Sequence, residues 1–171
     1  GAAHGGTVSC SVASAKISYS TDGGATWTST APSVTHVAQG LITVQVKAED
    51  PNYSSVTASY TLKVLPRTVT LTSATDSKVY DGTALTNDAI TVTGDGFVTG
   101  EGYTANVTGS QTNVGESSNA FTYSLTSGTQ AQDYVISTAE GKLTVTKNGT
   151  LTVTGVDYTG IYDAKAHGEA A

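Results

Sequence analysis

The amino-acid sequence predicts an all-β chain made of small sandwich modules in tandem. Three observations lead to this fold class: a composition that favours strands, apolar alternation with a period of two, and an internal repeat. Charged residues make up only 13% of the 171 residues, whereas about 25% is usual, and Thr, Ser and Val are abundant instead. Thr and Val are branched at Cβ and fit a pleated strand better than a helix. The 19 glycines lie mostly between alternating runs, which is typical of short strands joined by tight turns.

Alternation places the first strands. Apolar side chains at every second position of residues 42–48 face one way, and polar ones face the other, which predicts a half-buried strand. Residues 56–64 repeat the pattern, and the Asp-Pro-Asn sequence at 50–52 predicts a turn between the two strands. An earlier strand at 17–19 leads into Asp-Gly-Gly at 22–24, a strong hairpin signal.

The second half of the chain continues in the same way. Pro66 cannot continue a central strand, so the first module is expected to end there, and alternation restarts at Val69. No segment keeps a period of 3.6 over three turns, which predicts little or no helix. Further strands are expected at residues 89–93, 103–109, 119–125 and 142–147.

An internal repeat sets the domain organisation. Val79-Tyr80-Asp81-Gly82 recurs as Ile161-Tyr162-Asp163-Ala164, with the two tyrosines 82 residues apart. Ala-His-Gly at 3–5 recurs at 166–168, a separation of 163 residues and close to twice that unit. The sequence therefore predicts one module at residues 1–66, a second at 67–147, and the start of a third at 148–171.

These motifs resemble a known family. Tyr80-Asp81-Gly82 after a Thr- and Val-rich strand is similar to the Tyr-Asp-Gly repeat modules of bacterial surface adhesins, called YDG or MBG domains. Residues 17–27 and 44–53 look like the companion Ig-like repeat of the same proteins. The resemblance implies Ig-like sandwiches without catalytic residues, in a large repetitive protein at the bacterial cell surface or outside the cell. Ala164 departs from the motif, since it stands where the motif has Gly. A positive φ costs energy for Ala but not for Gly, so the resemblance leaves open whether residue 164 adopts one.

The repeat register also predicts an incomplete first module. Gly1 is level with Ala164, so the first module is expected to lack the strand that residues 148–163 would supply. A missing strand leaves an unpaired sheet edge. The tail at 148–171, from the same molecule or from another, is therefore expected to complete the first module by strand exchange.

Charge and residue chemistry exclude several functions. The net charge is −6, and the eight basic residues are scattered, so neither nucleic acid nor a membrane surface is expected as a partner. No His lies where it could serve as a base for a nucleophile, and no ligand set has metal spacing. We therefore expect no enzyme, no cofactor and no metal site. The single cysteine, Cys10, is expected on a strand at 9–12 as a buried thiol.

Two candidate functions remain. The first is a non-catalytic stalk or spacer that stacks on neighbouring modules of the same protein. The second is adhesion to host glycan or mucin through an aromatic platform of Trp27, Tyr19 and Tyr53. Calcium in the Asp-bearing turns and a Lys–Asn isopeptide crosslink stay open as further alternatives. Lys47 and Lys63 fall on the outward phase of their strands, which disfavours the crosslink.

Overall fold

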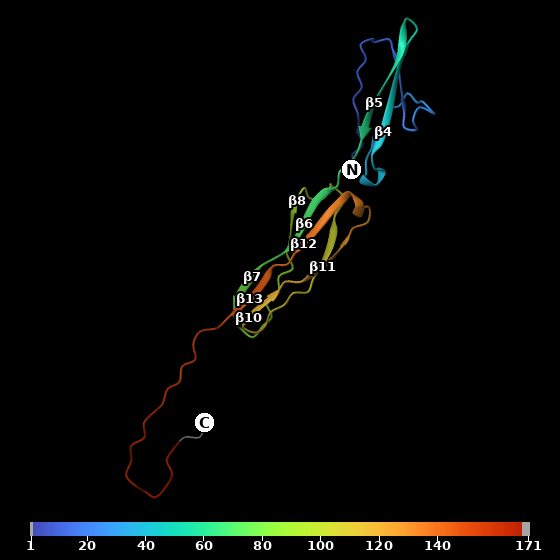
Figure 1. Cartoon of the computed structure of the whole chain (residues 1–171). Helices are drawn as coiled ribbons and strands as arrows, with labels where there is room; N and C mark the ends of the chain where they lie inside the picture. Colours follow the sequence, from blue (N-terminus) through green and yellow to red (C-terminus); the bar gives the residue numbers. More distant parts are fainter. Residues whose placement is uncertain (1, 169–171) are drawn as a thin grey trace.

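The computed structural model describes residues 2–168 and is all-β, as predicted (Figure 1). The described residues form thirteen strands and two short 3-10 helices. Each sheet draws its strands from one of two parts of the chain, the N-terminal unit (residues 2–66) or the central unit (residues 67–147). The two units follow one another along the length of the molecule, and the tail (residues 148–168) leaves from the far end of the central unit (Figure 1).

The N-terminal unit is built around a long hairpin. β4 and β5 pair antiparallel, and β2 pairs with the other edge of β4, which gives the order β2-β4-β5. The Asp50 carboxylate accepts the Asn52 N–H at 2.9 Å and so closes the hairpin turn where the sequence predicts it. The elements of this unit are β1 (His4–Gly5), β2 (Lys16–Ser20), β3 (Ser33–Val34), η1 (Val37–Gln39), β4 (Ile42–Asp50) and β5 (Tyr53–Leu62).

The inward phase predicted for β4 is confirmed. Val44 and Val46 are buried and pack with Val34 and Leu62 in the core of the unit. The start of β5 differs, because Val56 shares the inner face and is still 62% exposed. The inner face of the sheet is therefore covered at one end and open at the other.

The prediction for Cys10 was wrong. Cys10 is exposed and lies outside the strands. Residues 9–12 have alternating chemistry, but they pair with no described strand, so their backbone stays irregular and the thiol faces solvent.

The central unit confirms the four strands predicted for it. Its elements are β6 (Arg67–Ser73), β7 (Asp76–Val79), β8 (Ile90–Gly94), β9 (Tyr103–Val107), β10 (Gly115–Ser118), β11 (Phe121–Leu125), η2 (Ala131–Asp133), β12 (Tyr134–Ala139) and β13 (Lys142–Thr146). Its sheets have the orders β12-β6-β8, β10-β13-β7 and β11-β9. β6 runs parallel to β12 and antiparallel to β8, and β7 runs parallel to β13.

The core of the central unit has two parts. Val69 and Leu71 of β6 are 1% and 0% exposed and pack with Tyr134. Leu143 and Val145 of β13 form the second cluster with Leu85.

A buried amide lies beside this core. Asn119 is 0% exposed, and its Nδ2 donates to the backbone oxygens of Ala74 and Asn87. This amide therefore ties together loops that follow β6 and precede β8.

The tail is extended and solvent-exposed. Its described part, residues 148–168, contains no strand, and Leu151 and Val153 are 100% and 96% exposed. Ala164 adopts φ 62°, and no other non-glycine among the described residues has a positive φ. The departure from Gly has therefore not changed the backbone of the repeated corner.

Candidate functional site at the junction of the two units

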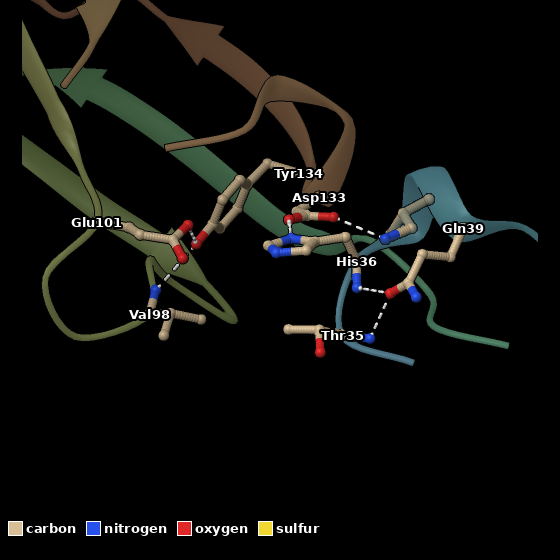
Figure 2. Close-up of polar contacts among 8 residues, drawn as sticks. Thr35, His36, Gln39, Val98, Glu101, Asp133 and Tyr134 are labelled. Atoms are coloured by element: carbon tan, nitrogen blue, oxygen red, sulfur yellow. Dashed lines mark hydrogen bonds and ion pairs between the residues drawn. The ribbon is translucent and has the colours of Figure 1, made fainter. Parts of the chain in front are cut away.

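The two units meet through a short linker. Residues 63–66 separate β5 from β6, and the linker ends in Pro66, whose fixed φ limits bending. A link of this length keeps the end of one unit beside the start of the next. The 3-10 helices η1 and η2, one from each unit, lie against each other at this point (Figure 2).

One carboxylate joins η1 and η2. Asp133 of η2 accepts the Val37 backbone N–H at 2.7 Å with Oδ1, and its Oδ2 lies 2.5 Å from His36 Nδ1. Both oxygens of one side chain are thus committed to the other unit (Figure 2). We call this arrangement the Asp133 clamp. Charge-assisted hydrogen bonds of this kind are about twice as strong as neutral ones, and two of them define an orientation as well as a distance.

The N-terminal unit holds its half of the clamp in place. Gln39 Oε1 accepts the backbone N–H groups of Thr35 and His36, at 2.5 and 2.9 Å. This capping arrangement orients the first turn of η1, in which the Val37 N–H donates to the carboxylate. Gln39 follows His36 by three residues, which is the spacing of a capping box, but His is not a usual capping residue, so the sequence alone does not mark this turn.

The central unit holds Asp133 through the next residue. The Tyr134 side chain is 6% exposed, donates its hydroxyl proton to Glu101 at 2.7 Å and accepts the Val98 N–H at 3.1 Å. Its ring packs against Phe97 with centroids 4.9 Å apart. Burial raises the pKa of Tyr134, and the Glu101 carboxylate beside it adds to the effect. Tyr134 therefore stays protonated and anchors η2 to its own unit.

Partial burial and hydrogen bonding shift the pKa of Asp133 in opposite directions. The side chain of Asp133 is 15% exposed and that of His36 is 32% exposed. Desolvation raises the pKa of Asp133, but the hydrogen bonds from His36 and Val37 outweigh it and hold the pKa below its usual 3.8. The carboxylate is therefore ionised at neutral pH, which is the form that accepts both bonds.

Apolar packing at the junction is incomplete. A cavity of about 300 Å³ lies between the units, bordered by Thr35 and Leu65 on one side and by Val98 and Asp133 on the other. Leu65 is 69% exposed. Because the units share this open space instead of a continuous apolar core, the Asp133 clamp is the main contact that orients them.

The aromatic residues predicted to contact glycan lie in three different surroundings. Tyr19 packs against the core on the inner face of the sheet. Trp27 is half-buried, donates its indole N–H to the Gly24 oxygen at 3.0 Å and lies under Lys47, whose Nζ is 4.9 Å from the ring centroid. Tyr53 is 63% exposed at the tip of the β4–β5 hairpin. The structure therefore does not join the three into one surface, and glycan binding stays a prediction.

The Tyr-Asp-Gly motif forms a corner after β7. Asp81 Oδ1 accepts the Thr83 N–H at 2.9 Å and Lys78 Nζ at 2.7 Å, and Gly82 has φ 83°. Asp163 repeats this turn in the tail by accepting the Lys165 N–H at 3.0 Å. The motif thus fixes a local turn, and in the described residues it lies away from the junction (Figure 1).

Metal-ligating groups, membrane-spanning helices and the two repeat-related histidines were the other features to place. No group of three or more metal-ligating side chains converges anywhere in residues 2–168. Neither of the two short helices in this range is long and apolar enough to cross a membrane. His4 lines the junction cavity, while its repeat equivalent His167 stacks on Tyr158 in the tail.

Comparison of the chain with protein-family models, with curated proteins and with solved structures finds no match.

Proposed function

We propose that this chain is a non-catalytic stalk or spacer segment of a bacterial cell-surface adhesin-like protein. In this proposal the N-terminal and central units are small Ig-like sandwiches of the Tyr-Asp-Gly type, and they act outside the cell. The tandem arrangement, the short linker and the Tyr-Asp-Gly corners support it. A spacer has to keep successive modules aligned so that they extend a distant tip.

The observation that carries the proposal is the Asp133 clamp. A carboxylate that accepts bonds from His36 and Val37 with its two oxygens restricts rotation of one unit about the linker. Interfaces between domains otherwise allow relative motion unless they are large and apolar. The chain therefore places its strongest polar contact between units at the point where a spacer would bend.

Small-angle X-ray scattering tests this role. Asp133→Ala removes both clamp bonds, and we expect a smaller mean maximum dimension and a scattering profile that only a bending ensemble fits. Asp88→Ala, at an exposed position of the central unit, is the matched control and should scatter like the wild type. Identical profiles for Asp133→Ala and the wild type would mean that the clamp does not stiffen the chain.

Adhesion to host glycan or mucin is the second candidate. The exposed Tyr53 ring at the hairpin tip, the part of the N-terminal unit furthest from the junction, favours it (Figure 1). A glycan array separates the two functions. Binding to a defined glycan set that Tyr53→Ala or Trp27→Ala abolishes, with an unchanged circular dichroism spectrum, would support adhesion, and uniform background would favour the spacer.

A further inference from the structure

One asparagine of the chain is followed by glycine. It is Asn148, the second residue after β13, and Gly149 comes next. Both residues are exposed and lie outside the strands, and the Asn148 side chain has no hydrogen-bond partner among residues 2–168. Gly149 has φ 69°, and no atom lies within 4 Å of the place where its Cβ would be. We call this segment the Asn148–Gly149 linker; it is open to water and free of packing.

The exposure of the Asn148–Gly149 linker follows from its place in the repeat. Residues 150–154 read Thr-Leu-Thr-Val-Thr, and residues 68–72 of β6 read Thr-Val-Thr-Leu-Thr. Pro66 and Arg67 therefore hold, in front of β6, the place that the Asn148–Gly149 linker holds here. A complete unit follows Pro66 and Arg67, and Pro66 is still only half-buried and Arg67 exposed. A linker in this place is accessible whatever part of the chain comes after it.

An exposed Asn-Gly pair is prone to cyclise. The Gly149 backbone nitrogen loses its proton to base and attacks the side-chain amide carbon of Asn148. The new C–N bond closes a succinimide ring, while the C–N bond to the amide nitrogen breaks and that nitrogen takes up a proton and leaves as ammonia. Glycine favours the attack because it has no Cβ and a wide range of backbone angles. Water then opens the ring, at one carbonyl to give aspartate and at the other to give isoaspartate.

The chain also has three Asp-Gly pairs, which cyclise by loss of water. They are Asp22-Gly23, Asp81-Gly82 and Asp95-Gly96. The carboxyl group reacts in its protonated form and resists attack as the carboxylate. In the Tyr-Asp-Gly corner, the hydrogen bonds from Lys78 and Thr83 lower the pKa of Asp81 and keep it ionised.

The other two Asp-Gly pairs are held in the same way. Asp22 accepts the Ser20 hydroxyl at 2.6 Å, and the Thr26 hydroxyl and N–H at 2.6 and 2.9 Å. These bonds lower the pKa of Asp22. Asp95 accepts the N–H and the hydroxyl of Thr68 at 2.8 and 2.9 Å, which lowers the pKa of Asp95. The turns therefore protect all three aspartates, whereas nothing holds Asn148.

We propose that the Asn148–Gly149 linker is a site of spontaneous modification, at which the asparagine becomes aspartate and isoaspartate while the chain stays folded. The other asparagines are followed by larger residues, which hinder the attack. The change places a negative charge in the linker, and isoaspartate adds one carbon to its backbone. The reaction needs only water and does not depend on the spacer function.

Trypsin isolates the site from every other amide side chain. Cleavage after Lys147 and Lys165 releases residues 148–165, in which Asn148 carries the only side-chain amide. The folded chain is kept for several days in mildly alkaline buffer made with heavy-oxygen water and is then digested briefly in ordinary water. The peptide should carry an acid in place of the amide, with heavy oxygen from the ring opening. Electron-transfer dissociation should identify isoaspartate as the larger product.

Two variants and an internal control decide the outcome. Asn148→Gln keeps an amide that would have to close a less favourable, larger ring, and Gly149→Ala adds a Cβ beside the attacking nitrogen. Both positions are free of packing, so both variants should fold, and both should lose the modification over the same time course. Asn113 is also exposed outside the strands, but Val114 follows it, so it should keep its amide. An unmodified wild type, equal rates in wild type and Gly149→Ala, or equal conversion of Asn113 and Asn148 overturns the proposal.

Unfolding tests the protection of the Asp-Gly pairs. In mildly acidic buffer, isoaspartate should accumulate at Asp22, Asp81 and Asp95 when the chain is unfolded in urea, because the hydrogen bonds of the turns are then lost. The folded chain should show none at these positions over the same period. Equal accumulation in the folded and unfolded chains would mean that the turns do not make the fold selective for Asn148.

Discussion

Replacing Asn119 with Ala should destabilise the central unit by about 2–4 kcal/mol. Its Nδ2 donates to the Ala74 oxygen at 3.0 Å and to the Asn87 oxygen at 2.8 Å, and the side chain is fully buried. Each of the two half-buried acceptors left without its donor costs about 1–3 kcal/mol, which is about 2–6 kcal/mol for the pair. One term acts the other way, because Asn119 Oδ1 is buried and finds no partner in residues 2–168, and Ala removes it. The backbone bonds of Asn119 survive the change.

Because the sequence has a single tryptophan, the stabilities of the N-terminal and central units can be measured separately. Trp27 lies in the N-terminal unit, so its fluorescence follows that unit, while far-ultraviolet circular dichroism follows both. In urea, Asn119→Ala should move one circular dichroism transition to lower denaturant and leave the Trp27 midpoint in place. A loss of this size lowers the melting temperature of a unit of about 80 residues by about 10–25 °C. Asn113→Ala, in an exposed loop, is the control. A change below about 0.5 kcal/mol would refute the reasoning.

Three further predictions concern the junction, the motif and the core. Because the hydrogen bonds from His36 and Val37 hold the pKa of Asp133 below its usual 3.8 in the folded chain, the clamp contributes fully above that usual pKa and is lost as the pH falls through the lower folded pKa. In a scattering titration from pH 7 downward, the wild type should begin to bend only below the usual pKa, whereas Asp133→Ala should show no such transition. Gly82→Ala should cost about 1 kcal/mol of central-unit stability, because φ is 83° there, and urea titration would show it. Leu71→Ala should cost about 2–5 kcal/mol and Val92→Ala far less, since Leu71 is 0% and Val92 38% exposed; equal losses would contradict the difference in burial between these two paired residues.

The strands were predictable because their signal is local. Alternation in residues 42–48 reports the two faces of β4 directly, and the Asp-Pro-Asn turn leaves one geometry for the hairpin. Cys10 shows the limit of that signal. The pattern around it fits a strand, but a strand needs a neighbour, and residues 9–12 have none in the described chain.

The candidate site was not predictable from local pattern. His36 and Asp133 are 97 residues apart, and neither has neighbours that mark it as a contact between units. The same holds for Asn119, whose polar side chain in a Ser- and Ala-rich segment gives no sign of full burial. Such positions depend on which loops the fold brings together, whereas the repeat of residues 79–82 at 161–164 could be read directly from the sequence.

The parallel pairs of the central unit determine how it would respond to tension. The unit is entered at Arg67 and left after Thr146, so a pull along the molecule draws β6 and β7 one way and β12 and β13 the other. Because β6 is parallel to β12 and β7 to β13, the force runs along both strand pairs and loads their hydrogen bonds in shear, all at once. A sheet loaded across its strands opens one bond at a time. Single-molecule force spectroscopy should therefore find the central unit to be a mechanically strong element of the chain.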